Sequence, residues 1–457
     1  MQQNQQDISE PGNGAATATL EREGPALEAR NLFKVFGRRP EEVVRRLRQG
    51  ADRADLAGQG TAAVIDSSFE VRRGEIFVVM GLSGSGKSTL IRMLNGLQEP
   101  TAGEVLIDGT TITGVPEKEL RRIRRSSVSM VFQHFALLPH RTVLDNVAYP
   151  LEIQGVPAAE RRERALLAVE RAGLAGWHEK MPDELSGGMR QRVGLARALA
   201  ADTDIVLMDE AFSALDPLIR REMQEQLIEL QQELGKTIVF ITHDLNEAML
   251  LGDRIAVMRD GRIVQIGTPE EILTDPANDY VAQFVQDVDR ARVLTASAVM
   301  EPVRSLVTLT AGPRAALRTM RDQQTAAAFV VGTGRRLLGT VRDRDVIEQV
   351  RAGTTDLSLV VTSAVVSVGP DTALSEIIEP AVESALPVAV VDEDGRLLGA
   401  IPRVTLLAAL GNLGPQTGEL PLVEPPATLP TEMVTATLHA TGGPVDDAVL
   451  ASEGGVR

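Results

Sequence analysis

The fold of this chain is decided by the stretch Gly81-Leu-Ser-Gly-Ser-Gly-Lys87-Ser88. It fits the pattern G-x-x-x-x-G-K-[ST], and it lies between an apolar strand predicted over 76–80 and a predicted helix. Glycines let the backbone wrap closely, so that successive N–H groups and the helix N-terminus face bound phosphates. In such a loop Lys87 reaches the β- and γ-phosphates, and the Ser88 hydroxyl faces Mg²⁺. A simple glycine-rich turn is the alternative, and the flanking elements disfavour it.

Two acidic residues, Asp209 and Glu210, follow a second apolar stretch, Ile205-Val-Leu-Met208. Next to a bound nucleotide, Asp209 would hold Mg²⁺ through water, and Glu210 would orient and deprotonate the attacking water. Adjacent acids at the end of a strand are often only a helix cap. Their combination with the loop at 81–88 favours the catalytic interpretation.

A third motif, Leu185-Ser186-Gly187-Gly188-Met189, precedes a helix rich in Arg and Leu. An N-cap serine followed by two glycines forms a second phosphate-binding helix start. Taken alone, the pentapeptide is better explained as a simple helix cap. Its position about 20 residues before the Asp-Glu strand favours the functional interpretation.

Strands and helices alternate along the middle of the chain, which predicts an α/β fold with a mostly parallel sheet covered by helices. The hydrophobic pattern predicts strands at 27–35, 64–71, 76–80, 205–208 and 237–241, and helices at 158–172, 188–201 and 218–234. Between the first two strands, Val43, Val44 and Leu47 share one face of a short predicted helix.

A pattern of strand and glycine-bounded turn occurs twice between 295 and about 408, as Gly334-Arg-Arg-Leu-Leu-Gly339 and Gly395-Arg-Leu-Leu-Gly399. Its period of about 60 residues indicates a tandem repeat. We therefore expect a disordered leader at 1–25, a nucleotide-binding domain at 26–290, α+β repeats at 295–352 and 358–410, and a Pro/Thr/Gly-rich tail at 411–457. The tail is acidic, with six Asp or Glu residues against one Arg.

Composition excludes several classes of protein. The net charge of −16 argues against a nucleic-acid partner, which usually requires a basic surface. Without cysteine there is no disulfide, thiolate chemistry or Cys-based metal site, and a reducing compartment is favoured. The first residues lack the features of a signal peptide, and no apolar run approaches the ~20 residues that span a bilayer. We therefore expect any action at a membrane to occur through another chain.

The order and spacing of the three motifs resemble the nucleotide-binding domain of the ABC transporter superfamily, over about 27–290. The resemblance implies a P-loop NTPase fold and the cofactors ATP and Mg²⁺. It implies catalytic roles for Glu210, for the switch histidine His243 in Ile241-Thr-His, and for the Q-loop glutamine Gln133 in Val131-Phe-Gln-His. Met189 stands in the signature where Gln is commoner, which leaves the backbone contacts to phosphate unchanged.

The same resemblance assigns ligand contacts along the chain. It implies nucleotide contacts from Phe36, Gly81, Ser83, Gly84, Ser85, Gly86, Lys87, Ser88, Thr89, Ser186, Gly187, Gly188, Asp209 and Asp216, and metal contacts from Ser88, Gln133 and Asp209. Phe36 would stack on adenine, with Phe33 as the competing aromatic. Asp216, in Ala214-Leu215-Asp216, matches the D-loop at a dimer interface. In a head-to-tail homodimer, Ser186 and Gly188 of one copy complete the site of the other.

Several stretches narrow the resemblance to ATP-binding subunits of the glycine betaine/L-proline (quaternary amine) uptake family. They are the helical insert at 38–60, Met130-Val-Phe-Gln-His-Phe-Ala-Leu-Leu-Pro-His140 and Met208-Asp-Glu-Ala-Phe-Ser-Ala-Leu-Asp-Pro-Leu-Ile-Arg220. This branch implies transmembrane permease partners, an extracytoplasmic substrate-binding protein and a place on the cytoplasmic face of the membrane. The alternatives are an importer of another small polar solute, a non-transport ABC ATPase and a nucleotide sensor.

The repeats resemble tandem CBS domains, which commonly bind adenosine nucleotides through G-x-x-[ST]-x-x-[DN]. The first copy, Gly339-Thr-Val-Arg342-Asp-Arg-Asp345, lacks the hydroxyl. The second, Gly399-Ala-Ile-Pro402-Arg-Val-Thr405, lacks both the hydroxyl and the acid. We expect the pair and the acidic tail to report ionic strength, because charge pairs between the tail, basic patches and the membrane surface weaken as the Debye length falls from ~10 Å at 0.1 M towards ~3 Å at 1 M. The alternative is that the pair only stabilises a dimer.

Overall fold

The computed structural model describes residues 24–411 apart from 57, 134–135, 287 and 385. The predictions made for the leader and the acidic tail therefore lie almost entirely outside the described residues. Within the described residues, no helix is both long enough and apolar enough to cross a membrane.

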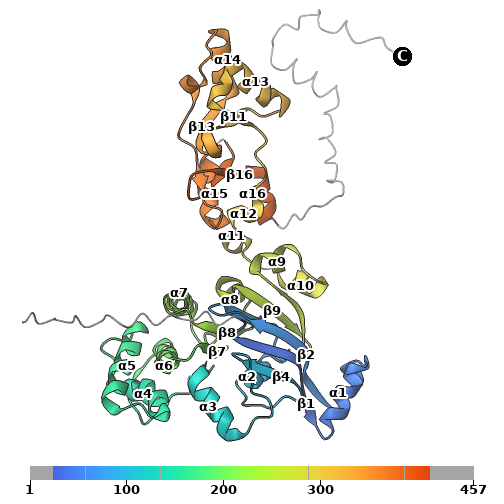
Figure 1. Ribbon diagram of the computed structural model, residues 1–457, viewed down its shortest axis with the longest axis vertical. Coiled ribbons are helices and arrows are strands. Elements are labelled where there is room, and N and C mark those ends of the chain that lie inside the picture. The colour runs from blue at the N-terminus through green and yellow to red at the C-terminus, as the bar shows by residue number, and fades with distance from the viewer. Residues whose placement is uncertain (1–23, 57, 134–135, 287, 385, 412–457) are drawn as a thin grey trace, which may run out of the picture. The chain divides into compact units, whose positions relative to one another are not determined.

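A six-stranded sheet forms the centre of the N-terminal domain, in the order β10-β9-β3-β8-β7-β6 (Figure 1). Its strands are β3 (Ile76–Met80), β6 (Val128–Val131), β7 (Ile205–Asp209), β8 (Thr237–Thr242), β9 (Arg254–Arg259) and β10 (Arg262–Gly267). All neighbours pair in parallel except β10, which is antiparallel to β9. The predicted α/β fold with a mostly parallel sheet is confirmed.

Both faces of this sheet are buried, which explains why its central strands are continuous apolar runs rather than alternating ones. In β3, Ile76, Val78 and Met80 pack on one face, while Phe77 and Val79 pack on the other. Helices α7 (Pro217–Leu234) and α8 (Leu245–Leu251) pack on the face that contains Ile76. Helix α2 (Lys87–Leu94) packs on the face that contains Phe77.

A separate antiparallel sheet shares the core with α2, in the order β2-β1-β4-β5. Its strands are β1 (Leu27–Gly37), β2 (Gly60–Val71), β4 (Ala102–Ile107) and β5 (Thr110–Thr111). The strands predicted at 27–35 and 64–71 form here, and their antiparallel pairing was not predicted. The insert forms α1 (Pro40–Arg48), which buries Val43, Val44 and Leu47 beside Phe33, as its periodicity predicts.

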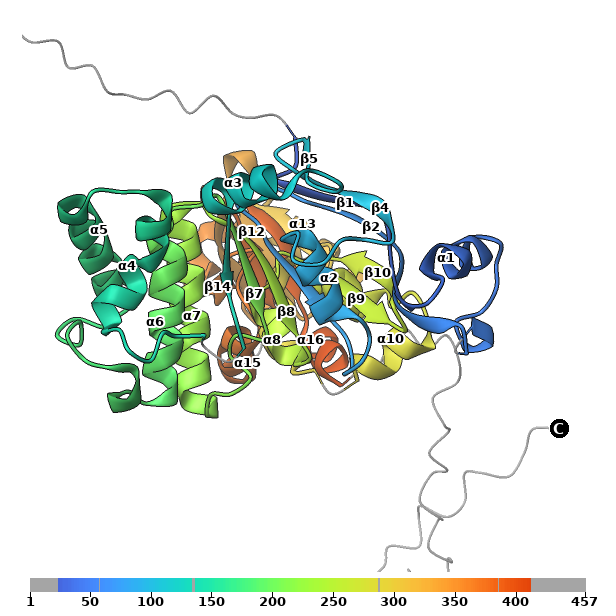
Figure 2. The same ribbon diagram turned by 90° about the horizontal axis from the view of Figure 1, so that it is seen from below.

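A group of helices completes the nucleotide-binding domain. It contains α3 (Glu117–Ser127), α4 (Val143–Gln154), α5 (Ala158–Arg171) and α6 (Gly187–Ala200), and the chain continues through α9 (Pro269–Thr274), α10 (Asp279–Phe284), α11 (Arg290–Val293) and α12 (Ala296–Val299). Helices α4, α5 and α6 share a core of their own. They lie together at one side of the two sheets, while α1 lies at the opposite side (Figure 2).

The tandem repeat folds as two matching three-stranded sheets, β11-β12-β13 and β14-β15-β16. The elements are β11 (Leu306–Thr308), α13 (Gly312–Asp322), β12 (Ala327–Val331), β13 (Leu337–Arg342), α14 (Asp343–Arg351), β14 (Ser367–Val368), α15 (Leu374–Glu383), β15 (Val388–Val391), β16 (Leu397–Ile401) and α16 (Arg403–Leu410). Val330 pairs with Gly339 in the first copy, and Val390 with Gly399 in the second. The register therefore repeats with the sequence.

Candidate functional site

The glycine-rich loop at 81–88 packs so closely on its neighbours that side chains are excluded at two positions. A Cβ at Gly81 would lie 2.1 Å from the carbonyl oxygen of Met258, and a Cβ at Gly86 would lie 2.1 Å from that of Ala63. Gly86 also has φ +106° at the N-cap of α2. The loop is thus pressed against β9 and β2 at the start of a helix, where backbone N–H groups favour an anion.

Lys87 is the first residue of α2, and its side chain is almost wholly buried. Its Nζ donates to the carbonyl oxygens of Gly81 at 2.8 Å and Leu82 at 3.1 Å. Burial lowers the pKa of Lys87, while the carboxylates of Glu210 and Asp209 act in the opposite direction. An anion bound in the loop would favour the charged form of this ammonium further.

Ser88, at the end of the loop, and Asp209, at the end of β7, bring a hydroxyl and a carboxylate together. Ser88 Oγ donates to Asp209 Oδ1 at 3.3 Å. Burial raises the pKa of Asp209, opposed by the Ser88 hydrogen bond and by the positive charges of Arg92 and Lys87. A magnesium ion takes such oxygen ligands, using one or two carboxylates together with substrate phosphates. The donor set therefore fits Mg²⁺, and no cluster of three His, Asp or Glu residues exists within the described residues to hold a metal without the nucleotide.

Glu210 follows β7 in a left-handed conformation, with φ 46°. Such a conformation costs a non-glycine residue about 1–3 kcal/mol and is often found at functional sites. Its backbone N–H donates to the Ile241 carbonyl at 3.0 Å. Its Oε2 accepts from Gln133 Nε2 at 3.1 Å and lies 3.3 Å from His243 Nδ1. The structure therefore brings together all three residues predicted to be catalytic.

Two further residues support this site, and the motif reasoning did not single them out. Ser213 donates its hydroxyl to the Glu210 carbonyl at 2.9 Å, and Gln133 Nε2 lies 3.4 Å from the same hydroxyl. Burial raises the pKa of Tyr280, on α10, while the charge of Arg259 and the backbone of Leu82 in the phosphate loop act in the opposite direction. Ser213 lies inside a quoted motif and could have been found from its position. Tyr280 carries no local sequence signal.

The two aromatic candidates for adenine stacking have different environments. Phe36 is 43% exposed, whereas Phe33 is 2% exposed and packs in the core under α1. Arg48 lies over the Phe33 ring, 5.1 Å from its centroid. Only Phe36 of this pair presents a ring face that a ligand can reach.

The remaining predicted contacts lie on the loop or at two helix starts. Ser83 and Gly84 are exposed, Thr89 is half-buried, and Ser85 is buried with its Oγ unpaired within the described residues. Ser186 caps α6 by accepting from the Met189 N–H at 3.3 Å, and Asp216 caps α7 by accepting from the Ile219 N–H at 3.1 Å. Gly187 has open space around it, while a Cβ at Gly188 would lie 2.6 Å from Ile219. The hydrogen bonds of the described residues do not join Ser186 to the loop at 81–88.

A groove of about 320 Å³ lies beside the Gln133 segment, where β6 and α4 meet α6. Its walls include Phe132 and Ile153, whose side chains are 36% and 45% exposed. Tyr149 and Arg197 also line it, and Arg197 Nη1 donates to the Ala136 carbonyl at 2.7 Å. The groove therefore presents apolar and cationic groups next to Gln133.

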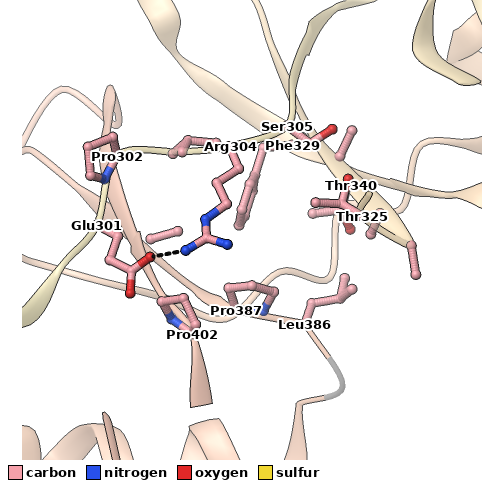
Figure 3. A pocket seen from close by; sticks show the side chains of 15 residues that line it. Glu301, Pro302, Arg304, Ser305, Thr325, Phe329, Thr340, Leu386, Pro387 and Pro402 are labelled. Carbon is pink, nitrogen blue, oxygen red and sulfur yellow. Dashed lines mark hydrogen bonds and ion pairs between the residues drawn. The ribbon is translucent and has the colours of Figure 1, made fainter. Parts of the chain in front are cut away.

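A second cavity, of about 260 Å³, lies in the tandem repeat (Figure 3). Arg304 and Glu301 line it and form an ion pair of 3.0 Å, and the Phe329 ring forms part of the wall. The hydroxyls of Ser305 and Thr325 are buried and have no partner within the described residues. The cavity is therefore mainly apolar, with two unused hydroxyls and one charge pair.

The comparisons with known proteins agree with this geometry. The ABC transporter family matches residues 64–213, and the CBS domain family matches 296–352 and 356–412. The chain is 49% identical to the glycine betaine transport ATP-binding protein OpuAA of Bacillus subtilis, over 84% of this chain and 92% of that protein. It is 47% identical to the glycine betaine/proline betaine transport system ATP-binding protein ProV of Escherichia coli, over 86% of this chain and 99% of that protein.

A third relative matches a smaller part of the chain. The trimethylamine N-oxide transport system ATP-binding protein TmoW of Ruegeria pomeroyi is 52% identical, over 60% of this chain and 81% of that protein. The phosphate loop, the serine-glycine signature and the Asp-Glu pair all fall inside the matched ABC region. The chain therefore belongs to the ABC transporter family, as an ATP-binding subunit with ATPase activity that carries tandem CBS domains.

Proposed function

We propose that this chain hydrolyses ATP to power import of glycine betaine or a proline-type osmoprotectant through a partner permease. The proposal is supported mainly by the length over which the chain aligns with its relatives. The glycine betaine and glycine betaine/proline betaine relatives align over 84% and 86% of the chain, which includes much of the CBS pair, whereas the trimethylamine N-oxide relative aligns over 60%. Because that last relative is 52% identical, the nucleotide domain alone does not discriminate the solute. Import of another small polar solute is the second candidate.

The proposed mechanism follows from the contacts around the phosphate loop. Lys87 exchanges its bonds to the Gly81 and Leu82 carbonyls for oxygens of the β- and γ-phosphates. Ser88, Gln133 and Asp209 would hold Mg²⁺, which would supply positive charge to neutralise those phosphates. The loop glycines with Ser83, Ser85 and Thr89 surround the phosphates through N–H and hydroxyl groups. Phe36 stacks on the adenine.

Hydrolysis requires a water held in line with the γ-phosphate. Glu210 orients this water and accepts its proton, and its carboxylate is held by Gln133 at 3.1 Å. His243 lies 3.3 Å from the same carboxylate, so it can contact the γ-phosphate and Glu210 together. The left-handed backbone at Glu210 fixes the direction of the side chain as it leaves β7.

The site becomes complete in a homodimer. Ser186, Gly187 and Gly188 begin α6 with N–H groups free to meet an anion, and we propose that they meet the γ-phosphate bound by the other copy. Asp216 stiffens the start of α7 beside that interface. A single nucleotide domain in the chain requires such a partner.

The groove beside Gln133 supports contact with the permease. Exposed Phe132 and Ile153 offer apolar surface to a short helix, and Gln133 follows Phe132 directly. Movement of a permease segment in this groove could therefore shift Gln133, which contacts the Glu210 carboxylate directly. We therefore propose a position at the cytoplasmic face of the membrane, with a substrate-binding protein on the other side and no nucleic-acid partner.

We propose a regulatory role for the CBS pair. Both copies depart from the adenosine-binding pattern, and Pro402 of the second copy lines the cavity where a hydroxyl would be expected. Charge pairs that involve exposed groups, such as Arg304 with Glu301, weaken as salt rises. An ionic-strength response is therefore favoured over adenosine-nucleotide sensing, and dimer stabilisation alone is the second possibility.

The proposal is tested with vesicles that hold the full-length chain, its permease and its binding protein. ATP-driven uptake of labelled glycine betaine is measured while luminal salt is raised stepwise, in competition with proline, choline and trimethylamine N-oxide. Uptake of glycine betaine that rises with salt supports both parts. Salt-insensitive uptake refutes the ionic switch alone, and a lack of glycine betaine uptake with intact ATPase activity refutes the substrate class.

A further inference from the structure

Arg220 lies near the start of α7, and its guanidinium contacts the loop that follows β7 and the loop that follows β8. Nη2 donates to the Leu215 carbonyl at 3.2 Å and to the Ser213 carbonyl at 3.5 Å. Nη1 lies 3.2 Å from Asp244 Oδ2. One side chain therefore joins the segment that follows β7 to the segment that follows β8.

Each of these two segments contacts Glu210. On the first, Ser213 Oγ donates to the Glu210 carbonyl at 2.9 Å and lies 3.4 Å from Gln133 Nε2. On the second, His243 precedes Asp244 in the chain, and its Nδ1 lies 3.3 Å from Glu210 Oε2. The contacts form a closed ring around Glu210, and Arg220 is the member that joins its two sides.

Asp244 is itself held in place by the backbone around it. Its N–H donates to Thr242 Oγ1 at 2.9 Å. Its Oδ1 caps α8 by accepting from the N–H groups of Asn246 at 2.9 Å and Glu247 at 3.3 Å. Because Oδ1 serves the helix, Oδ2 is left for Arg220, and a shift of Asp244 moves the backbone of the adjacent His243.

We propose that Arg220 is a positioning residue for ATP hydrolysis, which sets the separation of Ser213 and His243 around Glu210; this rests on the proposed roles of Glu210 and His243. No hydrogen bond of the described residues joins Arg220 to Glu210, so it acts through its neighbours. A guanidinium can donate to these three acceptors in a fixed plane, whereas an ammonium is a point charge and cannot reproduce the geometry.

A positioning role for Arg220 predicts a large loss of kcat together with a small change in stability. Arg220 and Asp244 are 29% and 33% exposed, and ion pairs of this kind contribute little to stability. A misplacement of about 1 Å at a catalytic group can lower turnover about 100-fold. Loss of the guanidinium is therefore expected to lower kcat by roughly 10- to 100-fold, while leaving the unfolding midpoint and the KM for ATP nearly unchanged.

The test compares Arg220→Met and Arg220→Lys with the matched control Arg221→Met in the full-length chain. Arg221 lies on the same helix and pairs at 3.0 Å with Glu225 on an exposed face. ATPase kinetics and thermal unfolding are measured for each variant. The structure predicts a lower kcat for Arg220→Met, only partial rescue by Arg220→Lys, and wild-type values for Arg221→Met.

Two results would overturn the proposal. One is a kcat for Arg220→Met equal to that of Arg221→Met. The other is a loss of kcat accompanied by an equal loss of ATP affinity or by a clear fall in the unfolding midpoint, because either would indicate a structural role. Glu210→Gln, measured in parallel, tests the hydrolytic site separately from the positioning role of Arg220. If it stays active, the assignment of the hydrolytic site fails; if it is inactive while Arg220→Met is normal, only the positioning role fails.

Discussion

Replacement of Gly86 by alanine tests whether the phosphate loop depends on close backbone contact. Gly86 has φ +106°, and a Cβ there would lie 2.1 Å from the Ala63 carbonyl oxygen. Gly84, two residues earlier in the same loop, has φ +79° and nothing within 4 Å of a built Cβ. The two alanine variants therefore share the conformational cost and differ in the steric contact.

The expected losses of activity follow from the conformational cost and from the steric contact. A left-handed conformation costs an alanine about 1–2 kcal/mol, and this applies to both variants. At Gly86 the loop must also move by about 0.9 Å to bring the contact to 3.0 Å, because the obstacle is backbone. A displacement of that size at catalytic groups corresponds to about 100-fold in kcat/KM, or about 2.7 kcal/mol.

The assay is steady-state ATP hydrolysis by the full-length chain, with thermal unfolding as a second measurement. We expect Gly86→Ala to lose about 100-fold in kcat/KM and Gly84→Ala to lose much less, with similar unfolding midpoints. Equal activities for the two variants would show that the clash with Ala63 has no consequence for the phosphate loop.

Three further outcomes are expected. Phe36→Ala should raise the KM for ATP several-fold with little change in stability, whereas Phe33→Ala should lower the unfolding free energy by about 3–5 kcal/mol; the opposite pattern would exchange their roles. Burial raises the pKa of Glu247, so the fold favours its protonated form, and stability is lost as pH rises from 4.5 through the raised pKa. Glu247→Gln keeps the contact with Gln224 and carries no charge. This variant should therefore unfold at a higher temperature than wild type at pH 7, and the difference should shrink as pH falls towards 4.5. Thr325→Val should stabilise the fold by up to about 1–3 kcal/mol, because the buried hydroxyl has no partner within the described residues, and a destabilised variant would reveal a hidden hydrogen bond.

Much of the architecture could be predicted because local patterns determine it. The run Ile76 to Met80 is apolar at every position, and it forms a strand buried on both faces. Val43, Val44 and Leu47 share a helical face, and all three are buried in α1. The 60-residue repeat predicts matched registers, and the pairs Val330–Gly339 and Val390–Gly399 match. The hydrophobic periodicity of the sequence is sufficient to predict an element and its buried residues where that element packs through one face.

Features that depend on contacts between distant segments could not be predicted in this way. The antiparallel sheet joins β1 to β4, which are separated by two α-helices and two other strands, and nothing local sets that order. Tyr280 reaches the phosphate loop from nearly 200 residues away. The ring through Arg220 and Asp244 needs the turns after β7 and β8 to lie side by side, which follows only from the parallel pairing of these strands.

We expect hydrolysis at Glu210 to drive the import of a betaine-type solute. The most direct test measures ATP-driven uptake of labelled glycine betaine in vesicles that contain the permease, the binding protein and either the wild-type chain or Glu210→Gln. We expect uptake with the wild type and none with Glu210→Gln, although the variant still binds ATP through Lys87. Uptake at the wild-type rate with Glu210→Gln would show that hydrolysis at this residue does not drive import.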